Sequence, residues 1–302
     1  MPRSRTAAPA TPQAAARPPG FTASRTGVTI GLALGGGGAR GMSHIPVLQA
    51  FDDLGIKPDF IAGSSIGALL GAGYAAGLSG QDLHDLATET FRNRNALLAR
   101  LWQLRPRRLA DVFGSGLAQF DPLKVLQLFA GSHLPDTFEE LAIPLTVLAT
   151  DFYGCGEVDI RSGPLAPAIA ASFAIPAVFR PVRLQGKVLI DGGVANPLPF
   201  DALPQDCSIV VAVDVVGTPV PRPGKHFPTT LDALFGASQI LMRSITAEKV
   251  KQRMPHILVR PDVGNIRVLD FMKTRGVLDA AAPLREDVKQ QLTDAINKQL
   301  SQ

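Results

Sequence analysis

The chain has 302 residues, enough for one large domain or two small ones, and its 46% hydrophobic content is that of a globular protein rather than a disordered or fibrous one. Its formal net charge of +4 arises in residues 1–26, which contain four arginines and no acidic residue, so the rest of the chain holds 26 basic and 26 acidic residues. This balance gives no indication of the basic surface that a nucleic-acid-binding protein needs.

Residues 1–26 are rich in arginine, alanine and proline, and we expect them to form a disordered tail before a folded domain at 27–302. The tail lacks the continuous apolar segment of a secretory signal. The uncharged run 60–81 is long enough to cross a bilayer, but its many Gly, Ala and Ser residues favour a helix in a protein core. Cys155 and Cys207 lack the spacing of a metal site or a disulfide framework. We therefore expect a cytoplasmic protein without a transmembrane helix or a zinc site, and we expect no cofactor.

Short apolar and β-branched runs alternate with helical patterns along the body of the chain, which predicts an α/β sandwich. The predicted strands are residues 26–34, 57–62, 143–151, 156–160, 186–190, 207–215 and 256–260. The predicted helices are a pattern around 45–51 and the segments 66–78, 81–91, 231–253 and 284–300. No internal repeat is visible, and the segments that carry chemistry span most of the body, so we expect one domain.

The first of these segments is a glycine run, LGGGGARG at residues 34–41, between a predicted strand and a predicted helix. Gly36, Gly38 and Gly41 fit the G-x-G-x-x-G pattern of a dinucleotide-binding loop, but no acidic residue follows at the offset that would hold a ribose. Consecutive glycine N–H groups also form a binding site for a developing oxyanion. We favour the oxyanion hole and keep nucleotide binding as an alternative. Arg40 would either brace this loop or attract an anionic head group.

A G-x-S-x-G pattern follows the second predicted strand, with Gly63, Ser65 and Gly67 in the defining positions. This pattern is typical of a serine nucleophile on a sharp turn between a strand and a helix. It makes Ser65 the nucleophile and Ser64 only its neighbour. A serine hydroxyl is a weak nucleophile unless a base lies beside it.

Two candidates for that base follow in the chain. Asp191 and then His226 would complete the serine, acid, histidine order of an α/β-hydrolase, but His226 lies in a proline-rich loop and the serine follows only the second strand. Asp191 ends a predicted strand and could take the serine proton directly if it stays ionised. Alternatively, its Asp-Gly-Gly sequence only caps a turn. The other histidines are expected to be solvated or hydrogen-bonded structural residues: His44, His84, His133 and His256.

The segments GGGGARG, GSSIG and DGG, in this order, resemble the patatin-like phospholipases, particularly their small bacterial members. The resemblance covers roughly residues 28–270 and includes SGPLAPAIAASFAIPAVFRPV at 162–182, DGGVANPLP at 191–199 and IVVAVDV at 209–215. It implies a three-layer α/β/α sandwich that hydrolyses lipid acyl esters through a serine–aspartate dyad, with no histidine and no metal in the chemistry.

By this resemblance Ser65 is the nucleophile and Asp191 the base. The oxyanion hole would be formed by Gly36, Gly37 and Gly38, with Arg40 completing the motif. The candidate walls of an acyl pocket, which are equally consistent with ordinary core packing, are Phe173, Ile175, Val178 and Phe179. Three alternatives stay open: a thioesterase or acyltransferase with the same dyad, a non-catalytic lipid-binding protein, and a nucleotide-binding protein.

Residues 91–108 hold six arginines and no acidic residue, interleaved with leucines and the chain's single tryptophan. An apolar stripe flanked by arginines is the pattern of a helix that lies on an anionic membrane surface. The residues predicted to dock there are Trp102, Arg105, Arg107 and Arg108. The alternative is that the leucines pack into the body and the arginines pair with acids elsewhere.

Overall fold

The computed structural model describes residues 27–92, 119–130, 132–221, 227–264 and 266–302. The predicted tail, most of the segment 91–108 with its docking residues, and His226 lie outside the described residues. The predictions made for these parts therefore stay predictions.

The described residues form an eight-stranded sheet with the order β5-β6-β3-β2-β1-β7-β8, and β4 pairs with β3. The strands that run parallel are β1 (Ile30–Leu34), β2 (Phe60–Ser64), β3 (Leu145–Asp151), β7 (Ile209–Val213) and β8 (Ile257–Val259). Three further strands pair antiparallel: β4 (Gly156–Ile160), β5 (Val182–Leu184) and β6 (Lys187–Asp191).

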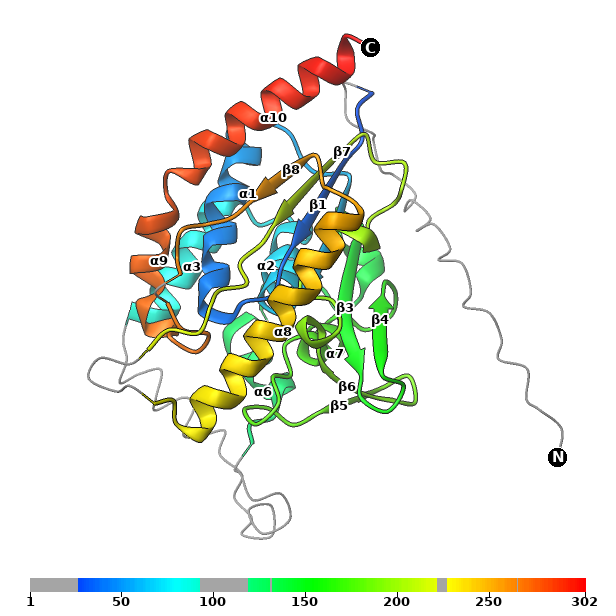
Figure 1. Ribbon diagram of the computed structural model, residues 1–302. Helices are drawn as coiled ribbons and strands as arrows, with labels where there is room; N and C mark the ends of the chain where they lie inside the picture. Colours follow the sequence, from blue (N-terminus) through cyan, green and yellow to red (C-terminus); the bar gives the residue numbers. More distant parts are fainter. Residues whose placement is uncertain (1–26, 93–118, 131, 222–226, 265) are drawn as a thin grey trace, which may run out of the picture.

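Helices cover both faces of this sheet, with α8 in front of it and α1 and α2 behind it in Figure 1. The helices are α1 (His44–Asp53), α2 (Ile66–Ala75), α3 (Gly80–Arg92), α6 (Pro122–Ala130), α7 (Leu165–Ser172), α8 (Thr230–Gln252), α9 (Thr274–Ala281) and α10 (Leu284–Leu300). Short 3-10 helices occupy Gly38–Ser43, Phe138–Glu140, Gly192–Val194, Phe200–Ala202 and Phe271–Lys273. The predicted three-layer α/β/α sandwich is confirmed. Among the described residues, no helix is long and apolar enough to span a bilayer.

Alternation along the strands divides the core in two. In β1, Leu32 and Leu34 point into the larger cluster, with residues of α1, α2, α7 and α10, whereas Ala33 points into a smaller one. Val211 and Val210 of β7 divide in the same way. Successive side chains of a strand face opposite sides of the sheet, so one buried apolar run supplies both helical layers.

The predicted strands and helices are present with shifted ends, and four elements were missed. The strand predicted at 57–62 begins only at Phe60. The preceding residue, Asp59, bonds to the start of β1 through its side chain: its carboxylate accepts the Ile30 N–H at 2.7 Å. The missed elements are α6, α7, α9 and β5. The residues of α7 are small and apolar nearly all round, so the helix has no apolar face to reveal its periodicity.

Candidate active site

Three strands meet where the candidate catalytic side chains lie. β2 pairs with β3 as far as Ser64, which is opposite Leu148. β6 runs in the opposite direction along β3 and ends with Asp191 opposite Ala149, the next residue of β3. β4 pairs with residues of β3 that also pair with β2 and β6, so β4 lies along one edge of β3, and both β2 and β6 lie along the other. On that edge the last residues of β2 and β6 face each other. The register of the sheet therefore brings Ser65, just after β2, next to Asp191.

Ser65 lies on a sharp turn between β2 and α2. Its φ of 54° and ψ of −121° are in a region that non-glycine residues rarely adopt. A Cβ added at Gly63 would lie 2.5 Å from the Cα of Ala68, and one added at Gly67 would lie 2.1 Å from the carbonyl oxygen of Leu34. The turn is so tight that both glycines of the G-x-S-x-G pattern are needed to bring α2 against β1 and β2.

Two hydrogen bonds orient Ser65. Its hydroxyl donates to Oδ2 of Asp191 at 2.6 Å. Its backbone N–H donates to Oγ of Ser172 at 2.8 Å, and the Ser172 hydroxyl donates in turn to the carbonyl oxygen of Leu148 in β3. Ser172 in α7 and Asp191 in β6 thus hold the serine from two sides.

The Asp191 carboxylate is buried, and no lysine or arginine of the described residues shifts its pKa. Its Oδ1 accepts the N–H of Gly193 at 2.8 Å, and the Thr150 hydroxyl donates to the Asp191 carbonyl oxygen at 2.8 Å. Burial raises the pKa of Asp191 from 3.8 to about 6, although the hydrogen bonds from Ser65 and Gly193 lower it. A carboxylate with this pKa is a stronger base than an exposed aspartate, so it can accept the serine proton near neutral pH.

The glycine loop follows β1 and leads into the 3-10 helix Gly38–Ser43. A Cβ added at Gly36 would lie 3.3 Å from the Cβ of Ser65, and one added at Gly37 would lie 2.4 Å from the carbonyl oxygen of Val215. The loop therefore runs between the serine and the residues that follow β7, in direct contact with both.

The three glycines of this loop do not have equivalent N–H groups. The Gly36 N–H donates to the carbonyl oxygen of Pro197 at 2.9 Å, whereas the N–H groups of Gly37 and Gly38 have no acceptor among the described residues. The prediction that Gly36 offers a donor to an oxyanion is therefore corrected, because its N–H anchors the loop. Gly37 and Gly38 have the donors that remain open.

Arg40 is buried and braces the glycine loop. Its Nε donates to the carbonyl oxygen of Val215 at 3.1 Å, and its Nη1 donates to that of Ile266 at 2.8 Å. With the Gln239 amide turned so that its oxygen faces the guanidinium group, this oxygen accepts hydrogen bonds from Nη1 and Nη2 of Arg40. Burial lowers the pKa of Arg40 to about 10, so the side chain stays charged at neutral pH. With 1% of the residue exposed, bracing the loop is the role that the structure supports, rather than attraction of a head group.

The four described histidines have other partners than the serine and its carboxylate, or are partly exposed to solvent. His44 is buried against a backbone carbonyl at 2.8 Å, and burial lowers its pKa to about 4. His256 accepts a backbone N–H, while His84 and His133 are half-exposed or exposed. Among these four, none hydrogen-bonds to Ser65 or Asp191.

The acyl-pocket candidates lie beside the site, in the segment between α7 and β5. Ala174 of this segment accepts the N–H of Asp191 at 3.1 Å. The rings of Phe173 and Phe179 pack edge to face with their centroids 5.3 Å apart, and Phe173 also packs on the main core. The candidates are half-buried: Phe173, Ile175, Val178 and Phe179. Both of the roles expected for them, acyl-chain wall and core, are compatible with this position.

Two residues that hold the site in place were not predicted from the sequence. Ser172 supports the Ser65 N–H, and the only signal for it is a single hydroxyl in a run of small apolar residues. Asn196, 1% exposed, donates its N–H to the carbonyl oxygen of Gly192 at 2.9 Å. Asn196 lies inside the DGGVANPLP stretch, but its side chain has no role that spacing alone would predict.

A strained serine that donates to a buried carboxylate beside open backbone N–H groups is typical of serine acyl hydrolases. Residues 32–204, more than half of the chain, match the family model described as patatin-like phospholipase. The chain belongs to the patatin-like phospholipase family, as its sequence motifs predict.

Relatives with this similarity include an NTE family protein of Mycobacterium tuberculosis, Rv1063c, which is 35% identical over 190 residues, or 63% of this chain and 49% of the relative. Patatin-like phospholipase domain-containing protein 6 of Homo sapiens is 32% identical over 193 residues, or 63% of this chain and 14% of its own. The chain thus spans about half the length of the mycobacterial relative. Among solved structures, VipD from Legionella pneumophila aligns over 89% of this chain and 67% of its own with a TM-score of 0.46 and 13% identity.

Proposed function

We propose that the protein hydrolyses acyl esters of phospholipids, lysophospholipids or related lipids, with Ser65 as the nucleophile and Asp191 as its base. The observation that carries this proposal is the 2.6 Å hydrogen bond from the Ser65 hydroxyl to an Asp191 carboxylate that the Gly193 N–H holds in place. Membership of the patatin-like phospholipase family supports a lipid ester as the substrate class.

In the first half of the reaction, Oγ of Ser65 attacks the ester carbonyl carbon while its proton passes to Oδ2 of Asp191. The carbonyl electron pair moves onto oxygen, and the N–H groups of Gly37 and Gly38 stabilise that negative charge. When the tetrahedral intermediate collapses, the bond to the alcohol breaks and the leaving oxygen takes the proton from Asp191. An acyl-serine and a free alcohol result.

In the second half, Asp191 accepts a proton from water as the water oxygen attacks the acyl carbon. The same two N–H groups stabilise the second oxyanion, and collapse returns the proton from Asp191 to Oγ of Ser65. The products are a free carboxylic acid and the original enzyme. An acceptor alcohol or a thioester substrate would use the same groups, and product analysis separates these outcomes from hydrolysis.

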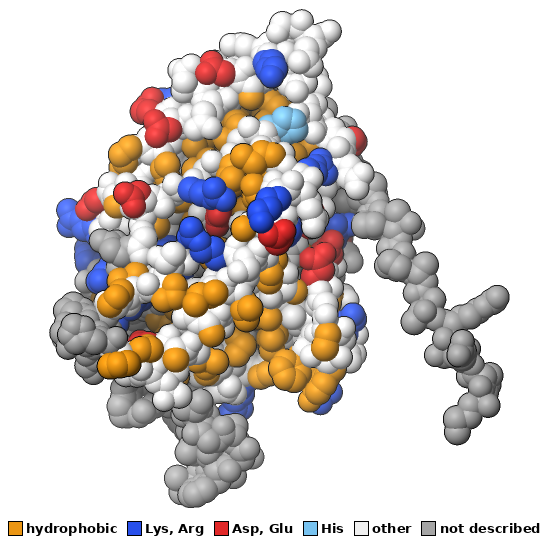
Figure 2. All heavy atoms as spheres, in the orientation of Figure 1, with side chains coloured by type: hydrophobic (Ala, Val, Ile, Leu, Met, Phe, Trp, Pro, Cys, Tyr) orange, Lys and Arg blue, Asp and Glu red, His pale blue; other side chains and the backbone are white. Residues whose placement is uncertain are grey.

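We also propose that the protein meets its substrate at a lipid surface. Figure 2 shows apolar side chains distributed over the face that α8 covers. Leu231, Leu234 and Leu241 of this helix are 48%, 47% and 64% exposed. Several exposed apolar side chains on one face are typical of an interaction site. The inner side of α8 contacts the turn that follows Asp191: a Cβ added at Gly193 would lie 2.8 Å from Cε of Met242 in this helix.

The proposed activity is tested with the purified protein and mixed phospholipid vesicles, with products measured by mass spectrometry. We expect free fatty acid from wild type, in amounts equal to the lysophospholipid formed or larger where lysophospholipid is hydrolysed in turn, and neither product from Ser65→Ala. Transfer of the acyl group to an added alcohol without free acid would favour the acyltransferase instead. A wild-type protein that leaves phospholipids, lysophospholipids and acyl thioesters unchanged would contradict the proposal.

A further inference from the structure

A three-residue segment, Asn196–Leu198, connects the glycine loop to the Asp191 loop. Asn196 donates its N–H to the Gly192 carbonyl oxygen at 2.9 Å, next to Asp191 in the chain. Pro197 accepts the N–H of Gly36 at 2.9 Å. The segment thus hydrogen-bonds to both halves of the proposed catalytic machinery, and its position affects the distance between the oxyanion donors and the base.

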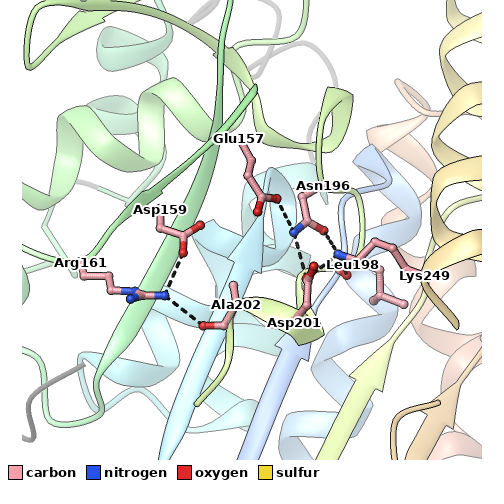
Figure 3. Close-up of polar contacts among 8 residues, drawn as sticks. All are labelled: Glu157, Asp159, Arg161, Asn196, Leu198, Asp201, Ala202 and Lys249. Carbon is pink, nitrogen blue, oxygen red and sulfur yellow. Dashed lines mark hydrogen bonds and ion pairs between the residues drawn. The ribbon is translucent and has the colours of Figure 1, made fainter. Parts of the chain in front are cut away.

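Lys249, near the end of α8, holds this segment through three acceptors (Figure 3). Its ammonium group donates to Oδ1 of Asn196, to the carbonyl oxygen of Leu198 at 3.1 Å, and to Oδ1 of Asp201. The Asn196 amide in turn donates to Oε2 of Glu157 in β4 at 2.8 Å and to Asp201 at 3.1 Å. Three ammonium protons and three acceptors are matched, so the network leaves no donor of Lys249 unused.

Charge makes Lys249 difficult to replace in this network. Asn196 is 1% exposed and lies between the carboxylates of Glu157 and Asp201. Burial raises the pKa of Glu157, and Lys249 and Asn196 counteract that shift. Without the ammonium group, two carboxylates would face one amide, and the carbonyl oxygen of Leu198 would lose its donor.

We propose that Lys249 is a positioning residue for the active site, which acts through Asn196 and Pro197 to fix the glycine loop relative to Asp191. This inference rests on the proposed function. Lys249 does not contact the serine or the aspartate; its effect passes through the hydrogen bond from Gly36 to Pro197 and so reaches the open donors of Gly37 and Gly38. Donors of an oxyanion hole stabilise the transition state only when they point at the developing charge, so a displaced loop lowers kcat and leaves KM nearly unchanged.

The test compares Lys249→Met with Lys251→Met on a soluble short-chain ester. Lys251 lies on the same helix, is 70% exposed in its side chain and pairs only with Glu248 among the described residues, so it is a matched control for loss of one lysine. Active sites are titrated with a fluorophosphonate so that kcat refers to folded, labelled enzyme. Lys249→Arg, which keeps a cation and several donors, and Lys249→Gln, which keeps two donors without charge, complete the series.

We expect Lys249→Met to lower kcat per titrated site about 10- to 100-fold with little change in KM, Lys249→Arg to recover part of that loss, and Lys251→Met to match wild type. If Lys249→Met does not fold, Lys249→Gln is expected to show the same loss of kcat. Equal kcat per titrated site in the Lys249 and Lys251 variants would overturn the inference, as would a loss explained wholly by a smaller titrated fraction. A wild type that neither labels nor turns over would instead contradict the proposed function itself.

Discussion

Asp191 and Asp201 are only ten residues apart in the chain, but their carboxylates have different surroundings. Asp191 is buried and is held by a hydroxyl and a backbone N–H, with its pKa raised to about 6. Asp201 is half-exposed and pairs with Lys249. A buried carboxylate without a cationic partner is costly to ionise, which makes Asp191 more basic than an exposed aspartate, whereas the charge of Asp201 is paired with the Lys249 ammonium group. The contrast supports the chemistry proposed for Asp191 and the positioning role proposed for the network that contains Asp201.

The largest effect is expected from removing the nucleophile. Ser65→Ala should lower kcat by about four orders of magnitude or more, because the covalent path is lost. Ser64→Ala is the matched control: Ser64 is also buried, but its hydroxyl has no hydrogen-bond partner among the described residues. We expect that variant to retain at least part of the activity on a soluble ester. If Ser64→Ala were inactive and Ser65→Ala active, Ser64 rather than Ser65 would be the nucleophile.

Asp191→Asn should lower turnover by several orders of magnitude and yet raise stability at neutral pH. The folded pKa of Asp191, about 6, lies above its unfolded value of 3.8, so the folded protein loses stability as the pH rises from about 4 to about 6, and the whole cost of ionising this carboxyl group is present above about pH 6. The neutral asparagine avoids this cost, with a gain of about 1–3 kcal/mol at pH 8 that shrinks as the pH falls below about 6 and is absent below about pH 4.

Thermal unfolding at pH 8 and pH 4 measures this gain, and Asp201→Asn is its control. Asp201→Asn removes a partner of Lys249 and should not stabilise the protein at either pH. If Asp191→Asn and Asp201→Asn changed the free energy of unfolding equally at pH 8, the proposed cost of ionising buried Asp191 would be contradicted.

The pH dependence of kcat/KM should show an acidic limb with an apparent pKa of about 6 on a neutral soluble ester, since only ionised Asp191 accepts the serine proton. Activity should fall about tenfold for each pH unit below that value. Replacing buried His44 would disturb the fold, so His84→Gln, at a half-exposed position, is the variant to compare. An acidic limb that moves in His84→Gln would point to a histidine in the mechanism.

Much of the fold and of the candidate site could be predicted from sequence, because the constraints are local. Gly63 and Gly67 are required by backbone contacts within the turn that holds Ser65, so a short motif contains the information. The contacts that could not be predicted join distant parts of the chain. Gly36 donates to Pro197, and Lys249 bonds to Asn196; neither contact has any periodicity or spacing in the sequence. Burial, which sets the pKa of Asp191, is likewise visible only in the folded chain.

The smallest effect concerns lipid docking. Leu234→Ser with Leu241→Ser should weaken binding to phospholipid vesicles several-fold, because two exposed apolar side chains of α8 are lost, and should leave hydrolysis of a soluble ester unchanged. Leu300→Ser on α10 removes a similarly exposed leucine, 56% against 47% and 64%, from another helix. Binding is measured by co-sedimentation with vesicles. Equal affinity of the α8 double variant and of Leu300→Ser would show that α8 does not contribute to lipid docking.

The most direct test of the central claim is the site of covalent labelling by a fluorophosphonate, measured by mass spectrometry of the intact protein and of its peptides. The proposed dyad predicts one adduct per chain, on Ser65, absent in Ser65→Ala and formed much more slowly in Asp191→Asn. It also predicts that Ser64→Ala still forms the adduct. An adduct on Ser64, or labelling of Ser65 at the wild-type rate in Asp191→Asn, would contradict the account.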